Sequence, residues 1–366
     1  MNHDNKIIDN MKPFWDLSLV VSDDMDSNQT MIWDAAKKAV DIFLNQLTEE
    51  VIKITITFVM KKGLDNFELI KKVIEYTESF DRFKNYKGDI PLYTISIHQS
   101  DVDENKIEYF KTLGSRLHIS LQTYGYDIDT DILYNNRNNP IYSGFEQLVA
   151  LSVNYGVKIS LTSIIKKANA RYFAKVLFFL YDASGFYNYS IFDHNDYWGN
   201  EDIEYLTQDI IKLQKHTVDH SCNFSVTNID QTCTATNPYG IDSCCGAGIC
   251  GFAVIPDGNI YPCHKCYNSF SDDDLFLMGD INKGIDIEKR KFVHEKNNYK
   301  IFPKKCRECI PQVRNRCHVC FAVNYYIYGD FNAIPDEFCA FQKSLYNELT
   351  KNIPLLSSKP QKESLK

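Results

Sequence analysis

The distribution of cysteine constrains this chain more than any other feature of its sequence. All 12 cysteines lie between Cys222 and Cys339, and the first 221 residues have none. Cysteines this dense in one third of a chain are typical of a disulfide framework or of a metal site. The N-terminal stretch MNHDNKIIDNMKPF lacks the apolar segment of a signal peptide, so nothing in it predicts export to an oxidising compartment. We therefore expect a cytoplasmic protein whose cysteines bind metal.

The spacing and number of the cysteines indicate the kind of metal. Cys306 and Cys309 form a CxxC pair, and Cys317 and Cys320 form another. These four cysteines alone would fit a zinc ion equally well. Further cysteines raise the total to about two sets of four thiolates, which favours iron–sulfur clusters. The additional candidates are Cys244 or Cys245, Cys250, Cys263 and Cys339.

This segment resembles the SPASM domain, which binds auxiliary [4Fe–4S] clusters in radical SAM peptide maturases. The resemblance rests on Cys245, on the DGNIYPC stretch that ends at Cys263, and on the cysteines from Cys306 onward. It implies two clusters, one held by Cys245, Cys250, Cys263 and Cys320 and the other by Cys306, Cys309, Cys317 and Cys339. Cys244 could replace Cys245, and Cys266 lies outside the pattern as a free thiol or a spare ligand. The chain departs from the family in the seven residues between Cys309 and Cys317.

A glycine in this segment has a predicted backbone role. Gly258 lies in PDGN, a turn sequence that requires a positive φ. We expect a hairpin here that returns the strand carrying Cys263 to the side of the first cysteine.

Residues 14–215 alternate between strand-like and helical patterns. The predicted strands are WDLSLVV, VIKITITFV, LYTISIH, RLHISLQ, VKISLTSI and YNYSIF, and amphipathic stretches such as NFELIKKVIEYTESF separate them. About six βα units fit, which is enough for a partial barrel and too few for one of eight units. We predict an α/β fold with a partial (β/α)6 TIM-like barrel over residues 1–215. A cysteine-rich domain over residues 216–345 and a polar, disordered tail over residues 346–366 would follow.

A partial barrel followed by a SPASM module is the layout of radical SAM maturases, so the resemblance extends over nearly the whole chain. That family carries a CxxxCxxC loop after its first strand, where three thiolates hold the cluster that binds S-adenosylmethionine. Here WDLSLVV runs into SDDMDSNQT, and Ser22, Asp23, Asp24 and Asp26 occupy that place. Aspartates are hard oxygen ligands and match an iron–sulfur cluster poorly.

Two further motifs of the family are also altered. Its Gly-Gly-Glu-Pro loop, which binds the amine of methionine, aligns with residues 60–63, and Lys62 takes the position of the carboxylate. Gln122 stands on the fourth strand where the family usually has an acid. The resemblance therefore implies a pseudo-radical-SAM protein that does not bind S-adenosylmethionine and is not an active radical SAM enzyme.

Such a protein would be a non-catalytic component of a ribosomal-peptide modification system that binds peptide or relays electrons. Its expected partners are a precursor peptide and a catalytic radical SAM subunit, docking on a strand edge that includes Tyr124, Tyr126 and Tyr134. Two alternatives stay open: an enzyme whose clusters and His264 perform redox chemistry without S-adenosylmethionine, and a zinc-binding structural module. A separate zinc site is a weaker idea and would use His216, His220, Cys222 and Cys233.

Composition argues against two other kinds of partner. The net charge of −8 disfavours nucleic acid, which attracts basic surfaces. The sequence contains no apolar run of about 18 residues, so we expect no membrane-spanning helix.

Overall fold

The computed structural model describes most of the chain, in separate ranges. These are residues 14–22, 30–49, 51, 53–60, 64, 66–86, 90–98, 101–123, 140–165, 167, 174, 187–192, 199–219, 245–267, 275–298, 301–309, 320–333 and 336–351. The strands are β1 (Phe14–Ser22), β2 (Lys53–Met60), β3 (Tyr93–His98), β4 (Leu117–Thr123), β5 (Lys158–Ile165), β6 (Tyr187–Phe192), β7 (Gly251–Val254), β8 (Asn259–Tyr261), β9 (Gly279–Asp280) and β10 (Gly284–Ile285). The helices are α2 (Trp33–Gln46), α3 (Phe67–Glu78), α4 (Asp81–Lys84), α5 (Glu104–Leu113), α7 (Pro140–Tyr155), α9 (Asn200–Asp219), α11 (Ile287–Lys296), α12 (Lys304–Arg307), α14 (Phe321–Tyr328) and α15 (Asp336–Lys351), with 3-10 turns η2 (Gly114–Arg116) and η4 (His264–Cys266).

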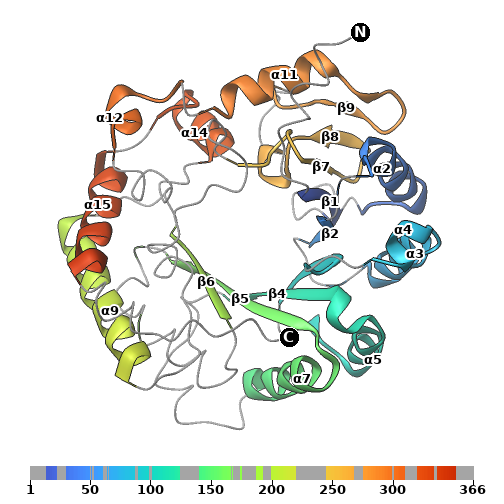
Figure 1. Cartoon of the computed structure of the whole chain (residues 1–366), viewed down its shortest axis with the longest axis horizontal. Coiled ribbons are helices and arrows are strands. Elements are labelled where there is room, and N and C mark those ends of the chain that lie inside the picture. The colour runs from blue at the N-terminus through green and yellow to red at the C-terminus, as the bar shows by residue number, and fades with distance from the viewer. Residues whose placement is uncertain are drawn as a thin grey trace.

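Strands β1 to β6 lie side by side in chain order and are all parallel. Helices α2, α3, α5 and α7 cover the outer side of this curved sheet, which lines the inside of a ring (Figure 1). Parallel neighbours joined by helices are the expected product of βα units. The predicted α/β architecture with six barrel strands is therefore confirmed.

The cysteine-rich part of the chain extends the same sheet. Strand β7 pairs in parallel with β1, with Leu17 opposite Phe252, and β8, β9 and β10 continue antiparallel beyond it. At the other side of the ring, helix α15 packs against α9 (Figure 1). The C-terminal segment thus contacts both ends of the barrel, and the ten described strands form one mixed sheet.

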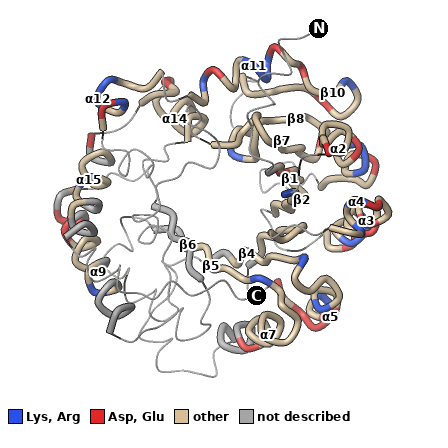
Figure 2. The backbone as a smooth tube through the Cα atoms, in the orientation of Figure 1, with Lys and Arg blue, Asp and Glu red and all other residues tan. Residues whose placement is uncertain are grey.

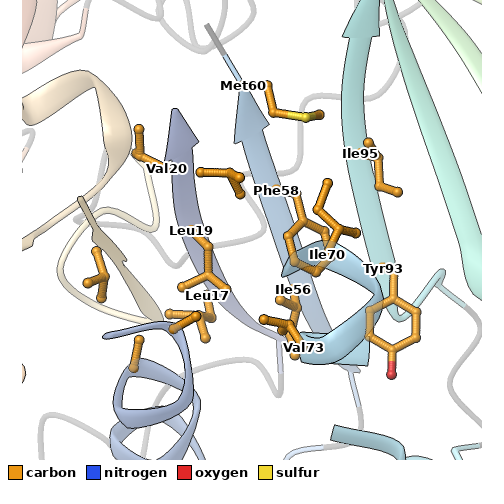
Figure 3. Close-up of a cluster of buried hydrophobic side chains, with 14 of the residues drawn as sticks. Leu17, Leu19, Val20, Ile56, Phe58, Met60, Ile70, Val73, Tyr93 and Ile95 are labelled. Carbon is orange, nitrogen blue, oxygen red and sulfur yellow. The ribbon is translucent and has the colours of Figure 1, made fainter. Parts of the chain in front are cut away.

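The outer face of the sheet forms the hydrophobic core. Leu17, Leu19, Ile56 and Phe58 are fully buried and, as Figure 3 shows, lie in one apolar layer with side chains of α3. Alternate residues of a strand point to one face, and an amphipathic helix presents an apolar stripe to it. Burial of a side chain of this size contributes about 1.5–3 kcal/mol, so this layer fixes the positions of the strands.

The inner face of the sheet carries hydroxyl, imidazole and carboxyl groups. Thr57 Oγ1 donates to Asp16 Oδ1 at 2.7 Å, and Ser18 Oγ donates to Asp16 Oδ2 at 2.9 Å. Further round, His118 Nε2 lies 2.9 Å from Ser160 Oγ, and a hydroxyl pair follows at 3.0 Å, Ser120 with Thr162. Filled barrels carry bulky branched side chains inside. Cross-strand hydrogen bonds hold this inner face instead.

Charged side chains lie mainly on the outer helices. Lys and Arg alternate there with Asp and Glu (Figure 2). Many of these charges pair within a helix, as do Lys37 and Asp41 at 3.3 Å. Exposed pairs of this kind contribute about 0–1 kcal/mol, so they affect solvation more than stability. Within the described ranges, no helix combines the length and apolar character needed to cross a bilayer.

Candidate metal centre

The first altered motif lies at the carboxyl ends of β1 and β2. Ser22 ends β1, faces Met60 across an irregular pairing and forms an antiparallel bridge with Thr30. Its hydroxyl is buried without a hydrogen-bond partner in the described structure. The other residues predicted for this region, Asp23, Asp24, Asp26, Lys61, Lys62 and Gly63, lie outside the described residues. The structure therefore places Ser22 beside Met60, where the two altered motifs begin.

The third altered position lies on the same edge of the sheet. Gln122 is near the end of β4, between His98 of β3 and Thr162 of β5. Its backbone is described and its side chain is not. The three altered positions thus lie at the carboxyl ends of the parallel strands β1, β2 and β4, the edge at which α/β proteins usually bind ligands.

A hairpin returns Cys263 to the start of the cysteine-rich segment. Gly258 has a φ of +92° and closes the turn between β7 and β8, as its sequence predicts. The β8 strand leads into Pro262, whose carbonyl accepts a hydrogen bond from the Gly248 amide at 3.1 Å. This hydrogen bond holds the loop after Cys245 against the segment that joins β8 to Cys263.

Four described cysteines gather at this hairpin. Cys263 directly precedes η4, and its Sγ lies 3.6 Å from the Sγ of Cys266, the last residue of η4. Cys320, at the beginning of α14, is close enough that its charge raises the pKa of both Cys245 and Cys266. The structure therefore brings together three residues of the first predicted set, Cys245, Cys263 and Cys320, and adds Cys266.

Burial strongly affects the thiols of this group. Burial raises the pKa of Cys245 to about 12, and it is also the main cause that raises the pKa of Cys266 and of Cys320. Cys263 differs because the hydrogen bond from Cys266 lowers its pKa to about 7. Thiolates are the form that binds metal, so three of these cysteines need a cation or a cluster to lose their protons.

Cys250, the fourth residue of the first predicted set, has different neighbours. It is 6% exposed and immediately precedes β7. Burial raises its pKa to about 11, while the nearby charges that act on it belong to Arg290 and Asp16.

The second predicted set is also brought together in its described members. Cys306 lies in the short helix α12, and the amide N–H of Cys309 donates a hydrogen bond to the Cys306 carbonyl at 3.2 Å. Cys339 lies in α15, and Lys305 pairs with Asp336 to join the two elements. Burial raises the pKa of Cys306, and the charges of Cys339 and Cys309 raise it further. The fourth member, Cys317, lies outside the described residues.

The donor chemistry of both groups fits iron–sulfur clusters. Thiolates are the usual ligands of such clusters, and each cysteine binds a separate iron. Within the described ranges, no three His, Cys, Asp or Glu side chains converge on one point as ligands of a single ion would. A cluster does not require such convergence, because its ligands surround a larger body.

Sequence reasoning missed two residues that support the first group. Asn297 is fully buried, and its Nδ2 donates to the Cys245 carbonyl at 2.9 Å and to the Ala247 carbonyl at 3.3 Å. Its Oδ1 lies 3.6 Å from Cys245 Sγ, as an acceptor for the thiol. The Tyr326 hydroxyl donates to the Cys266 carbonyl. No local motif marks these residues, which act over separations of 52 and 60 positions.

The structure describes few of the other predicted ligands. His264 is half-buried within η4, next to Cys263, and forms interactions of its own. His216 lies in the last turns of α9, with its side chain outside the description. Cys222, Cys233, Cys244 and His220 lie outside the described residues. The separate zinc site and the choice between Cys244 and Cys245 therefore stay predictions.

Comparison with known proteins finds similarity in solved structures and not in sequence families. No family model matches the sequence, and no curated protein matches it. A structure of anSMEcpe with bound AdoMet matches with a TM-score of 0.70 and 15% identity, covering 96% of this chain and 97% of that one. Another, of anSMEcpe with bound AdoMet and the Kp18Cys peptide, matches with a TM-score of 0.67 and 15% identity over 94% and 99%.

A third structure extends the comparison. SuiB of Streptococcus suis, bound to S-adenosylmethionine, matches with a TM-score of 0.55 and 12% identity, covering 92% of this chain and 77% of that one. The α/β fold with its mixed sheet is thus that of radical SAM maturase structures. All of these neighbouring structures contain S-adenosylmethionine (AdoMet). The sequence of this chain predicts that it does not bind this cofactor.

Proposed function

We propose that this chain is a non-catalytic iron–sulfur component of a ribosomal-peptide modification system. In this role it would bind peptide, or relay electrons to a catalytic radical SAM subunit, through two auxiliary [4Fe–4S] clusters. The observation that carries the proposal is a contrast within one fold. The cysteines of the C-terminal segment gather in two groups, whereas β1 ends at a serine and no cysteine precedes Cys222.

The clusters are supported by the positions of the thiols. The first group lies where the β7–β8 hairpin meets α14, and the second where α12 meets α15. Both belong to elements that continue or close the barrel ring. Ligation would therefore couple metal binding to the folding of the C-terminal third.

The loss of the cofactor site is supported by the end of β1. A radical SAM cluster needs three thiolates at that edge, and Ser22 offers a neutral hydroxyl. A hydroxyl is a hard donor and a poor match for iron–sulfur chemistry. The chain would thus keep the shape of a maturase without the group that cleaves S-adenosylmethionine.

Anaerobic purification tests the proposal directly. We expect about eight iron and eight sulfide per chain, the sum of two [4Fe–4S] clusters. With dithionite and S-adenosylmethionine the protein should form no 5′-deoxyadenosine, and calorimetry should detect no tight binding. A colourless protein that contains only zinc would contradict the clusters. Formation of 5′-deoxyadenosine would contradict the non-catalytic role.

Peptide binding is supported by the fold and by one neighbour, whose structure contains a peptide. The predicted docking residues Tyr124, Tyr126 and Tyr134 lie outside the described residues. A pull-down with precursor peptide and catalytic subunit tests them. Tyr126→Ala should weaken capture, and a folded triple tyrosine variant with unchanged affinity would exclude this surface.

A further inference from the structure

The first cysteine group has a member that the sequence pattern leaves out. Cys266 is fully buried and ends η4. Its amide donates to the Cys263 carbonyl at 3.0 Å, and its thiol contacts Cys263 Sγ. The turn therefore directs both thiols of this CxxC pair to the same side. CxxC pairs commonly supply two ligands to one cluster.

Helix α14 holds Cys266 and Cys320 close together. Tyr326 of α14 donates its hydroxyl to the Cys266 carbonyl. Phe276 is fully buried, and the centroid of its ring lies 5.5 Å from the ring centroid of Phe321 and 5.5 Å from that of Tyr326. Edge-on aromatic pairs of this kind contribute about 0.5–1.5 kcal/mol each beyond burial. This packing fixes the start of α14, which directly follows Cys320, against η4.

Cys250 lies in a different environment, which Asp16 of β1 and Arg290 of α11 form. Its carbonyl accepts a hydrogen bond from the Asp16 amide at 2.9 Å, which ties it to β1. Arg290 donates from Nε to the Gly248 carbonyl and from Nη2 to the Ile249 carbonyl, both at 2.8 Å. The guanidinium thereby clamps the turn ahead of Cys250, and its planar fork is suited to such paired contacts. The Cys250 thiol points toward the Gly246 carbonyl at 3.9 Å.

We infer that Cys266, not Cys250, is the fourth thiolate of the first cluster, together with Cys245, Cys263 and Cys320. The inference rests on the proposed function, because it assumes that a cluster is bound. On binding, the four thiols would release their protons to solvent, and Cys263 and Cys266 would separate onto two irons. Cys250 would keep a buried thiol, while the backbone of residues 248–250 anchors the loop to β1 and to Arg290 of α11.

Matched serine variants test this assignment. Both are made in a Cys306→Ala background, which removes a ligand of the second cluster and leaves about four iron per chain. Cys250→Ser should keep that iron, its sulfide and the electron paramagnetic resonance spectrum of the reduced background protein. Cys266→Ser should lose most of the iron or show the spectrum of a three-iron cluster. The reverse pattern, or equal retention in both variants, would overturn the inference.

Two further measurements keep the outcome clear. Circular dichroism shows whether Cys266→Ser folds. If it does not fold, crystals of the wild-type protein identify the fourth ligand. Anomalous scattering at the iron edge from its anaerobic crystals should locate the cluster against the Cys266 sulfur, and a cluster bound to Cys250 would refute the assignment. A wild-type protein without iron would contradict the proposed function itself, whereas iron bound through Cys250 would contradict this inference alone.

Discussion

Replacing Gly258 by alanine should destabilise the hairpin that positions Cys263. Gly258 has a φ of +92°, and a Cβ atom added there would lie 2.8 Å from Ile281 Cδ1 and 2.9 Å from Ile281 Cγ1. An L-residue with a left-handed backbone costs about 1–2 kcal/mol. Forcing an extra methyl into a packed site costs about 1–3 kcal/mol more. We therefore expect Gly258→Ala to lower the free energy of unfolding by about 2–5 kcal/mol.

Gly284 provides a matched control for this substitution. Its φ is +83°, and an added Cβ would have no atom within 4 Å. Gly284→Ala should therefore show the backbone strain alone, about 1–2 kcal/mol. The difference between the two variants measures the contact with Ile281. Replacing Ile281 by alanine in the Gly258→Ala protein should remove most of that difference.

Denaturant unfolding of the anaerobic protein measures these free energies, and iron content reports the site. Gly258→Ala should also bind less iron in the first cluster, because Cys263 follows β8 directly. Equal losses of stability for Gly258→Ala and Gly284→Ala would refute the role of Ile281. Full iron content in a destabilised Gly258→Ala protein would refute the link between the turn and the metal centre.

Three other changes test separate parts of the structure. Phe276→Ala should lower the free energy of unfolding by about 3–5 kcal/mol and also reduce the iron content. Phe110 is equally buried, so Phe110→Ala should cost as much stability but leave the iron content unchanged. Equal iron contents in the two variants would contradict the role of Phe276 in positioning α14. Burial, aided by Lys158, lowers the pKa of His118 below 6.5, so its share of stability is present above pH 6.5 and is lost as the pH falls toward the folded-state pKa. His118→Gln should therefore flatten the dependence of unfolding on pH in that range, and an unchanged profile would show that His118 does not titrate there. Cys339→Ala should remove about half of the iron while the first cluster keeps its spectrum, and loss of all iron would argue against two independent clusters.

The sequence by itself determined the elements and the turn chemistry of this protein. Strands such as β2 and helices such as α3 bury one face, and the spacing of their apolar residues follows from that burial. The helix over Glu104–Leu113 begins after Asp103, whose side chain accepts from the Lys106 amide, and local capping of this kind is visible in sequence. Gly258 is another local case, because a positive φ selects glycine whatever the rest of the chain does.

Only the tertiary structure decided which distant groups meet. The pairing of β7 with β1 places Cys250 beside Asp16, and the packing of α14 on η4 places Cys320 near Cys266. Asn297 reaches Cys245 across 52 positions of sequence. Cysteine spacing and the family resemblance predicted a metal-binding segment with Cys250 in the first set and Cys266 outside it, but they could not show that the Cys266 thiol lies against Cys263. Which thiols lie together depends on sheet register and helix packing, which arise from the summed burial of many side chains and leave no local mark in the sequence.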